Sequence, residues 1–226
     1  MHPHLESQVY WRLIALAQEV PELPQTSLFD WLADVLDGPL TSAQLAKLSL
    51  AVLQRKLPAE LASLSAERWQ TLLQILQGAL PAHLDPKPQP AAPGSLRAAF
   101  ASSDGLSVNG HFGNCTLFFI YQLDGQSQTL VDIRRYQQQE SMEANEARAS
   151  LLDGCHLLFC EAIGGPAAAR VIRHGIHPIK VKQDRDIQSQ LSQLNVLMSG
   201  TLPPWLAKVL GRKSDLSVRY AEDDGL

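Results

Sequence analysis

One stretch between two short apolar runs combines an imidazole and a thiol with many glycine and asparagine residues. It covers residues 102–115, in which His111 and Cys115 are four positions apart. Both side chains can ligate a transition metal, and Gly110 and Gly113 leave room for a bulky ligand beside the backbone. The stretch is therefore a candidate site for a metal or a metal cluster. The alternative interpretation is a turn-rich loop whose histidine is only exposed to solvent.

The other two cysteines flank an apolar run that is typical of a buried strand. Cys155 and Cys160 are five positions apart, so on one strand their side chains would point to opposite faces. We expect both thiols to be buried and to pack as small apolar groups, with Cys160 the better functional candidate because it ends the strand. The sequence has neither a C-x-x-C nor an H-x-x-x-H pair, which disfavours a structural zinc site.

A second glycine-rich segment, residues 163–167, predicts a turn from a strand into a helix. Gly164 and Gly165 leave N–H groups that can meet an anion together with the helix dipole. Beside the His111 loop, this turn can form one wall of a site for an anionic ligand. Taken singly, the basic side chains that follow are more typical of solvated positions; they are Arg170, Arg173, His174 and His177.

An enzyme is the alternative from another functional class. Asp104, Asp132 and Glu161 are carboxylates that a nuclease could use to hold metal ions on a mixed sheet. Asp104 is typical of a turn, however, and Asp132 has no carboxylate near it in the sequence. The sequence also has no P-loop, G-x-G-x-x-G or nucleophile motif, so we favour a protein without catalytic activity.

The composition limits the classes further. The 226 residues are 45% hydrophobic and 19% charged, which is ordinary globular composition. A formal net charge of −4 argues against nucleic acid as a partner. Three cysteines fit a reducing compartment rather than a disulfide framework, and no signal-peptide pattern or membrane-length apolar run is present. We therefore expect a cytoplasmic protein without a membrane partner.

Hydrophobic spacing predicts helices throughout residues 1–80. We expect a compact helical bundle without a polar constellation, which is typical of an interaction module. The predicted boundaries are prolines after the first helix at Pro21 and Pro24, an N-cap at Ser27, a capping box at Thr41 before a helix with Leu45, Leu48, Val52 and Leu53 on its buried face, a turn at Pro58, an N-cap at Ser65 and an end near Gly78.

The pattern changes after a proline-rich segment. Residues 81–95 predict an extended linker, residues 96–211 a core domain, and residues 212–226 a loose tail. A hairpin followed by alternating strands and helices predicts a mixed sheet with helices packed against it. The expected strands are 97–102, 116–123, 129–135, 155–160 and 176–181, and the expected helices are 141–152, 167–174 and 186–198, with 202–210 as a small terminal helix.

Several motifs of the second half resemble the nitrogenase iron-molybdenum cofactor biosynthesis family, which includes NifX, NifY, NafY and the C-terminal part of NifB. They are Ser-Asp-Gly at 103–105, Val-Asn-Gly-His-Phe-Gly at 108–113, the apolar run at 118–121, Ile-Gly-Gly-Pro-Ala-Ala-Ala at 163–169 and the run at 171–180. The helical first half, with Leu-Phe-Asp-Trp-Leu at 28–32 and the proline linker, is similar to the module that NifY and NafY add to this core.

This resemblance implies a ribonuclease-H-like core and a sterile-alpha-motif-like helical domain. It implies that the core binds the iron-molybdenum cofactor or its precursor, with His111 as the metal ligand. The expected cofactor-binding residues are His111, Asn109, Gly110, Phe112, Gly113, Gly164 and Gly165, with Cys115 as a weaker candidate. The helical domain would engage apo-dinitrogenase, the cofactor-deficient MoFe protein, and aid cofactor insertion. The alternative is a protein that stabilises apo-dinitrogenase without binding metal.

Overall fold

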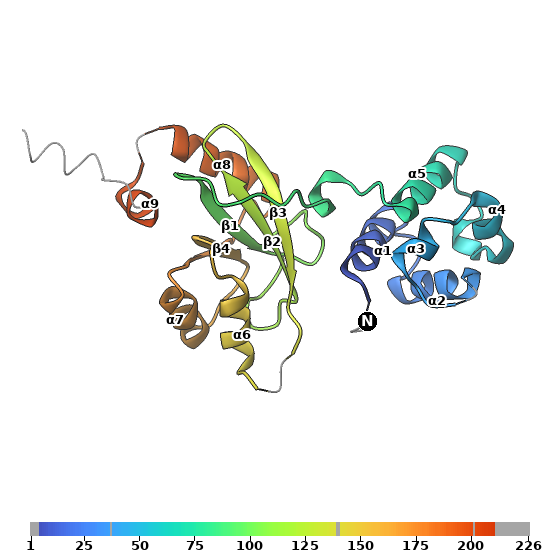
Figure 1. Ribbon diagram of the computed structural model, residues 1–226, viewed down its shortest axis with the longest axis horizontal. Helices are drawn as coiled ribbons and strands as arrows, with labels where there is room; N and C mark the ends of the chain where they lie inside the picture. Colours follow the sequence, from blue (N-terminus) through green and yellow to red (C-terminus); the bar gives the residue numbers. More distant parts are fainter. Residues whose placement is uncertain (1–4, 37, 139–140, 201, 211–226) are drawn as a thin grey trace, which may run out of the picture. The chain divides into compact units, whose positions relative to one another are not determined.

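The chain folds into a helical unit and a unit built on a β-sheet (Figure 1). The computed structural model describes residues 5–36, 38–138, 141–200 and 202–210. The two compact units are Met1–Asp85 and Pro86–Leu226. The predicted sequence of helices followed by a mixed sheet with helices is confirmed. The predicted tail, residues 212–226, lies outside the described residues, as does residue 211.

The first unit consists of short helices joined by tight turns. Its α-helices are α1 (Ser7–Glu19), α2 (Gln25–Val35), α3 (Ser42–Leu45), α4 (Leu50–Leu53) and α5 (Ala66–Gln77), and its 3-10 turns are η1 (Gln54–Lys56), η2 (Ala59–Leu61) and η3 (Ala82–Leu84). The buried faces of α2 and α5 meet through Trp31 and Trp69, whose rings make an edge contact with centroids 6.3 Å apart. Such aromatic contacts add to the stabilisation that burial of the apolar faces supplies.

Local capping chemistry decides where several of these helices begin and end. The hydroxyl of Thr41 accepts from the Gln44 N–H, and that of Ser65 accepts from the Arg68 N–H, both at 3.3 Å. Gly78 ends α5 with a left-handed φ of 107°, as the sequence predicts.

Two predicted boundaries are wrong. The second helix begins at Gln25 rather than behind Ser27, with Pro24 at the N-cap position. Proline is tolerated there because the N–H that it lacks would have no partner within the helix. The predicted third helix is interrupted, since Ser49 takes an extended backbone between α3 and α4. Leu45 and Leu53 are nevertheless both buried, so side chains of the predicted apolar face pack in the core on both sides of the break.

Arg12 is a buried cation that joins three helices of this unit. From α1, its Nη1 donates to the Ser42 carbonyl in α3 at 3.0 Å and to the Leu76 carbonyl at the end of α5 at 2.7 Å. Burial lowers the pKa of Arg12 below its ordinary value, although the nearby Glu6 carboxylate favours its charge. The guanidinium thereby satisfies a carbonyl that the end of a helix leaves without an intrahelical partner.

The proline-rich segment differs from the predicted linker. Leu84 in η3 is fully buried, and His83 Nε2 lies 2.8 Å from Gln18 Oε1, so the start of the segment belongs to the helical unit. Further on, the Lys87 N–H donates to the Leu130 carbonyl, and the Arg97 guanidinium donates to the Gln89 carbonyl. Composition alone did not reveal these contacts because prolines restrict the backbone without preventing their neighbours from packing.

The second unit contains a five-stranded mixed sheet. Its strands are β1 (Leu96–Ala101), β2 (Leu117–Leu123), β3 (Gln128–Arg135), β4 (Leu157–Cys160) and β5 (His177–Lys180), in the order β3-β2-β1-β4-β5. β2 is antiparallel to both β1 and β3, whereas β4 is parallel to β1 and to β5. The predicted hairpin is confirmed, and β1 lies at the centre of the sheet.

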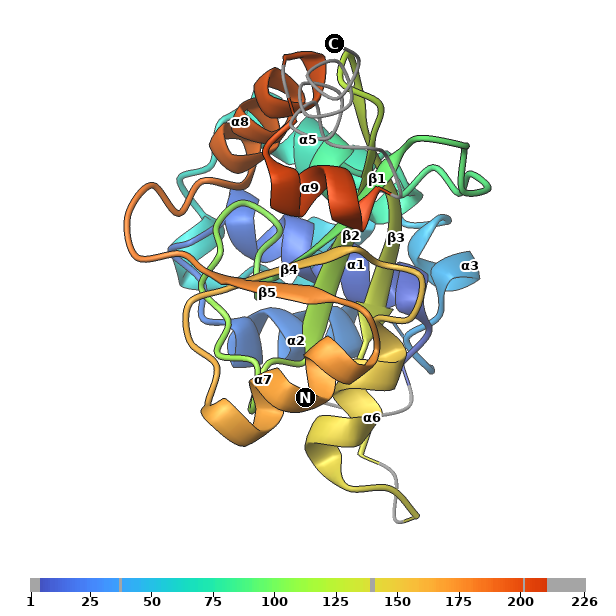
Figure 2. The same cartoon turned by 90° about the vertical axis from the view of Figure 1, so that its left-hand side faces the viewer.

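Helices cover both faces of the sheet (Figure 2). These are α6 (Ala144–Leu151), α7 (Gly165–Arg173), α8 (Ile187–Ser199) and α9 (Pro204–Val209). α6 and α7 pack on one face, whose core cluster includes Phe118, Leu158 and Val171, and α8 lies on the other side. The helix predicted over residues 186–198 is α8, and the Asp186 carboxylate caps it by accepting from the Ser189 N–H at 2.7 Å. Among the described helices, none has the length and apolar character needed to cross a membrane.

Two helix starts in this unit differ from the prediction. α6 begins at Ala144 rather than near residue 141, because the Glu143 carboxylate accepts from the N–H groups of Asn145 and Glu146 and serves as the cap. α7 begins at Gly165, two residues before the predicted start, with Pro166 in its first turn. A charged cap and a proline in the first turn are both favourable at a helix N-terminus.

His174 joins α6 to the end of α7 through two carboxylates. Its Nε2 lies 2.9 Å from Glu146 Oε1, and its Nδ1 lies 2.7 Å from Asp153 Oδ1. The contact with Glu146, followed by that with Asp153, raises the pKa of His174 above its ordinary value. Only the protonated ring has two N–H donors for these two acceptors.

We predict that His174 makes the stability of the sheet unit depend on pH. Because its pKa is higher in the folded chain than in the unfolded one, the stabilisation is complete below the ordinary histidine pKa of about 6.5 and is lost as the pH rises through the raised value. His174→Gln should lower the free energy of unfolding by about 1–2 kcal/mol at pH 6 and by less at pH 8.5. Hydrogen exchange of the β2 amides measures this difference.

Asp153→Asn should reduce the same pH dependence, because it removes one of the two acceptors. If wild type and His174→Gln differ equally at both pH values, the ion pairs of His174 do not have the assigned effect.

Candidate functional site

Residues 102–115 form the loop between β1 and β2, and backbone hydrogen bonds fix it to two other segments. The Phe112 N–H donates to the Ala162 carbonyl at 2.9 Å, and the Glu161 N–H donates to the Gly110 carbonyl at 2.9 Å. On another side of the loop, the Val108 N–H donates to the Arg185 carbonyl at 2.8 Å. The His111 loop is therefore held by the segment after β4 and by the segment before α8.

A side-chain network shapes the first half of the loop. The Asp104 carboxylate accepts from the N–H groups of Leu106 at 2.8 Å and Ser107 at 3.0 Å. Burial opposes its charge, but these hydrogen bonds prevail and hold the pKa of Asp104 below its ordinary value. The Asn109 amide accepts from the Ser103 N–H and donates to the Asp104 carboxylate. Asp104 and Asn109 thus fix the backbone that leads to His111.

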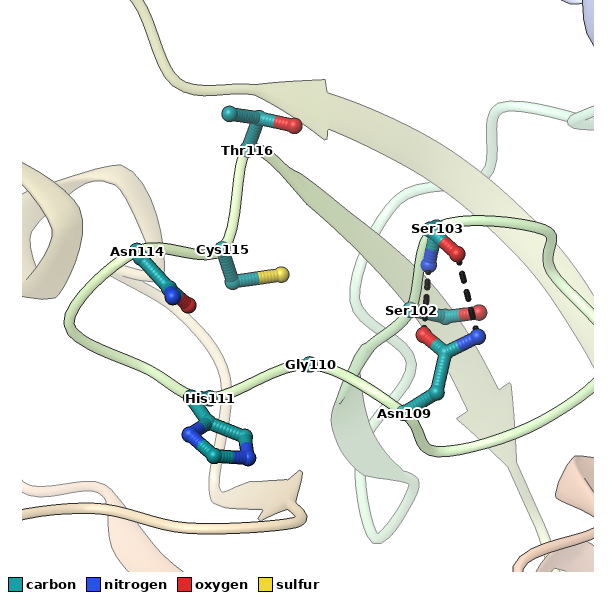
Figure 3. Close-up of a pocket in the computed structure, with 8 residues that line it drawn as sticks. All are labelled: Ser102, Ser103, Asn109, Gly110, His111, Asn114, Cys115 and Thr116. Carbon is teal, nitrogen blue, oxygen red and sulfur yellow. Dashed lines mark hydrogen bonds between the residues drawn. The ribbon is translucent and has the colours of Figure 1, made fainter.

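A pocket of about 410 Å³ opens beside this network (Figure 3). It is lined by Ser102, Ser103, Asn109, Gly110, His111, Asn114, Cys115 and Thr116. Figure 3 shows the side chains of Asn114 and Cys115 pointing into the space between the two arms of the loop, whereas the His111 ring projects away from that space. The imidazole and the thiol, four positions apart in sequence, therefore face different surroundings.

His111 presents its imidazole to solvent from a fixed backbone. The side chain is 56% exposed, while its own carbonyl accepts from the N–H groups of Asn114 and Cys115. Its Nε2 lies 3.6 Å from Glu161 Oε2, and Glu161 Oε1 lies 2.8 Å from Arg185 Nη2. An accessible imidazole on a fixed loop is suited to act as a ligand for a metal in an incoming molecule.

The predicted cofactor-binding residues next to His111 differ in how deeply they are buried. The Phe112 ring is fully buried and packs against Phe118 with centroids 6.1 Å apart, so it anchors the loop in the core. Gly113 is exposed. Gly110 is close-packed, because a Cβ at this position would lie 2.9 Å from the Ala101 carbonyl carbon. Gly110 therefore allows the loop to lie directly against β1.

The three cysteines share one hydrophobic cluster. Cys115, Cys155 and Cys160 are all buried and all belong to the core on the α6 and α7 side of the sheet. The prediction that Cys155 and Cys160 face opposite sides is wrong, because β4 begins at Leu157 and Cys155 precedes it. Burial raises the pKa of all three thiols, to about 11 for Cys155 and Cys160.

Cys115 also has a structural hydrogen bond. Its thiol donates to the Leu117 carbonyl at 3.0 Å. A thiol that is buried and has a raised pKa is a poorer metal ligand than a thiolate. The geometry thus favours His111 over Cys115 as the ligand.

The glycine-rich turn lies beside the His111 loop. Glu161 and Ala162, which bond to the loop, directly precede Ile163 and the turn. Gly164 and Gly165 are exposed, and a Cβ added to either would meet no described heavy atom within 4 Å outside the neighbouring residues. The open start of α7 can therefore receive an anionic group next to the loop.

The basic side chains after this turn are engaged elsewhere. Arg170 pairs with Glu143 at 3.2 Å, and Arg173 pairs with Glu146 at 3.7 Å. His177 stacks on Trp205, with ring centroids 5.4 Å apart. The cation that is linked to His111, through the Glu161 carboxylate, is Arg185, which the sequence analysis did not single out. Its position immediately before the cap of α8 carries no signal that it faces His111.

The structure does not assemble the carboxylate set of the enzyme alternative. The Asp104 carboxylate accepts from a main-chain N–H of its own loop. Asp132 pairs with Arg134 on β3, and Glu161 lies after β4 beside His111. Within the described part of the chain, no group of three or more His, Cys, Asp and Glu side chains could hold a metal ion. A metal bound to His111 would therefore need further ligands of another kind, either from the protein or from the molecule that carries the metal.

We predict that Gly110 and Gly113 respond differently to the same substitution. In Gly110→Ala, the new Cβ would approach the Cys115 thiol to 2.7 Å and the Ala101 backbone to 2.9 Å. Such overpacking should lower the free energy of unfolding by about 1–3 kcal/mol. In Gly113→Ala, the nearest atom, Asn145 Oδ1, is 3.8 Å away, so stability should be unchanged. Hydrogen exchange of the β1 and β2 amides measures both variants, and equal losses would contradict the prediction.

Similarity to known proteins extends over most of the chain. Residues 94–196 match the family described as "Dinitrogenase iron-molybdenum cofactor". The chain is 48% identical to Protein NifY of Klebsiella pneumoniae over 204 residues, which cover 89% of each protein. It is 31% identical to Protein NifY of Azotobacter vinelandii, with 96% of each protein covered. Protein NifX of Sinorhizobium fredii is 37% identical over 145 residues, which cover 60% of this chain and 91% of that protein.

These matches agree with the division into two units. Because 204 aligned residues exceed the length of either unit, the similarity to NifY extends over both. The family match lies within the sheet unit and contains His111, Glu161 and Arg185. The resemblance found from the sequence motifs is thereby confirmed: the chain belongs to the NifX and NifY family and carries the dinitrogenase iron-molybdenum cofactor domain.

Proposed function

We propose that the protein is an accessory factor of nitrogenase maturation that binds the iron-molybdenum cofactor, or its precursor, through His111. Membership of the family supports the maturation role. The observation that carries the binding proposal is the exposed imidazole of His111 on a loop that backbone hydrogen bonds hold in place. The proposed function involves carrying and delivering a cluster rather than turning over a substrate.

The surroundings of His111 suit a large anionic cluster. The ligand brings its own metals and sulfides, so the protein needs to supply an accessible donor rather than a complete coordination shell. The exposed glycine turn at Gly164 and Gly165 offers backbone N–H groups and the N-terminus of α7 to negative charge. The backbone of the His111 loop is shaped by Asn109, Gly110, Phe112 and Gly113. Cys115 lines the pocket in this loop.

The helical unit is proposed to bind apo-dinitrogenase. Its buried cation, Arg12, is engaged within the unit by the carbonyls of Ser42 and Leu76. A chain that binds both the cluster and its acceptor would raise the concentration of one near the other. The same proposal includes a cytoplasmic location and a sterile-alpha-motif-like fold for the helical unit. It also includes a ribonuclease-H-like fold for the sheet unit, which is supported by the strand β2 running antiparallel to both of its neighbours, β1 and β3.

The alternative is an interaction protein that stabilises apo-dinitrogenase without binding metal. It differs from the proposal in one measurable property. Iron and molybdenum analysis of the protein, after incubation with isolated cofactor and removal of free cofactor, should find both metals in stoichiometric amounts. Absence of both metals would favour the alternative.

We predict that His111→Ala weakens binding of the isolated cofactor by about 100-fold or more, equivalent to about 2.7 kcal/mol. The reason is the loss of the donor nitrogen, whereas the fold should persist because this side chain is largely exposed. The matched control is His177→Ala, which removes an exposed histidine that stacks on Trp205 outside the loop. Anaerobic titration measures both, and unchanged affinity in His111→Ala would refute the assignment of the ligand.

We also predict that residues 1–85 bind apo-dinitrogenase without the sheet unit. The fragment should end at Asp85 rather than at residue 80, because Leu84 is buried within the helical unit. A pull-down with apo-dinitrogenase compares this fragment with residues 86–226 and with the full chain. Retention of residues 86–226 alone would assign the interaction to the sheet unit instead.

A further inference from the structure

We infer that Glu161 orients the His111 imidazole so that Nδ1 is the nitrogen presented to the cluster, and that Arg185 holds Glu161 in this role. The inference rests on the proposed function and adds a positioning residue to it. It comes from the contacts of three side chains that lie on separate segments: the loop after β1, the segment after β4 and the segment before α8.

The side-chain contacts form a chain from the cation to the imidazole. Arg185 Nη2 lies 2.8 Å from Glu161 Oε1, and the other carboxylate oxygen, Oε2, lies 3.6 Å from His111 Nε2. The second distance is slightly too long for a direct hydrogen bond. Because the imidazole is 56% exposed, a small side-chain rotation can close this distance when a ligand binds. Glu161 is less exposed, at 26%, and is therefore the better-fixed partner.

The backbone fixes this arrangement independently of the side chains. The Glu161 N–H donates to the Gly110 carbonyl, directly before His111, and the Arg185 carbonyl accepts from the Val108 N–H. His111 and Ala162 also form an isolated parallel β-bridge. The main-chain positions of His111, Glu161 and Arg185 are thus tied to the same short piece of loop. Such preorganisation is what a ligand-positioning contact requires.

The contacts select one ring nitrogen. A histidine that binds a metal through one nitrogen commonly donates its other N–H to a carboxylate, which fixes the tautomer and makes the ligand more basic. Here the carboxylate faces Nε2, which leaves Nδ1 for the metal. Nδ1 is the ring nitrogen nearer to the main chain, where bulky neighbours would obstruct a cluster. Gly113, two residues after His111, is exposed and has no side chain to obstruct it.

Arg185 accounts for the presence of a carboxylate beside the site of an anionic ligand. An isolated glutamate there would repel the cluster, since like charges a few ångströms apart disfavour each other. Pairing with Arg185 at 2.8 Å offsets that charge while leaving Oε2 available to the imidazole. The pair therefore orients His111 at a small electrostatic cost to cluster binding.

The sign of one substitution distinguishes orientation from simple charge. Glu161→Gln removes a negative charge, so a purely electrostatic role predicts tighter binding of the isolated iron-molybdenum cofactor. A positioning role predicts weaker binding, by about 10–100-fold, with a larger loss in Glu161→Leu, which has no acceptor oxygen. The control is Asp132→Asn, which removes a carboxylate paired with Arg134 on β3 and should bind as wild type. Unchanged or tighter binding in Glu161→Gln overturns the inference.

Two further measurements test the inference. The first shows whether the Glu161→Gln variant keeps the fold of the loop, and the second identifies the ring nitrogen of histidine that binds the cluster. Hydrogen exchange at the amides of Phe112 and of residue 161 should be equal in wild type and Glu161→Gln, because their main-chain bonds to the Ala162 and Gly110 carbonyls do not involve the altered side chain. In the wild-type full chain, histidine labelled with ¹⁵N only at Nδ1 should give strong hyperfine coupling to the bound cluster in pulsed electron paramagnetic resonance. Strong coupling only from Nε2-labelled histidine overturns the inference even if the Glu161 variants misfold.

The result for His111→Ala keeps the two proposals distinct. If His111→Ala binds the cofactor as tightly as wild type, the proposed ligand is wrong. If His111→Ala loses binding while Glu161→Gln retains it, the ligand assignment stands and only the role of Glu161 is wrong.

Discussion

Main-chain pairing of the loop between β1 and β2 with two distant segments is the constraint on which the site depends. The N–H of Phe112 and the carbonyl of Gly110 pair with the segment after β4, and the N–H of Val108 pairs with the segment before α8. Without these bonds, a loop rich in glycine would sample many conformations, at a large cost in entropy to any ligand that requires one of them. The structure concentrates this ordering in the backbone and leaves the His111 side chain exposed.

Buried polar groups support the same loop at its ends. At the start, Asp104 collects N–H donors and remains charged despite partial burial. At the end, the buried guanidinium of Arg148 donates to the Cys115 carbonyl at 3.0 Å and lies 3.8 Å from the centre of the Tyr136 ring. Such groups are costly to bury unless they are paired, so their partners define one conformation of the loop. The three cysteines pack nearby as apolar groups, consistent with their raised pKa values.

The two units differ in the chemical groups that they present. The sheet unit carries the accessible imidazole, the open glycine turn and the family match. In the helical unit, the buried Arg12 joins helices to one another. The similarity to NifY extends over both units, whereas the match to NifX of Sinorhizobium fredii covers 60% of the chain. These coverages are consistent with a common core to which some family members add a helical unit.

The sequence by itself determined the features that depend on nearby residues. Helix caps at Thr41 and Ser65 were predictable because a cap and its N–H partner lie within one turn, and the motif around His111 identified the family. The shared cluster of the cysteines was not predictable, since the packing of distant segments against one face of the sheet brings them together. Only the tertiary structure placed Glu161 and Arg185 beside His111. Strand register and long-range main-chain pairing set that proximity, and no local pattern in the sequence records it.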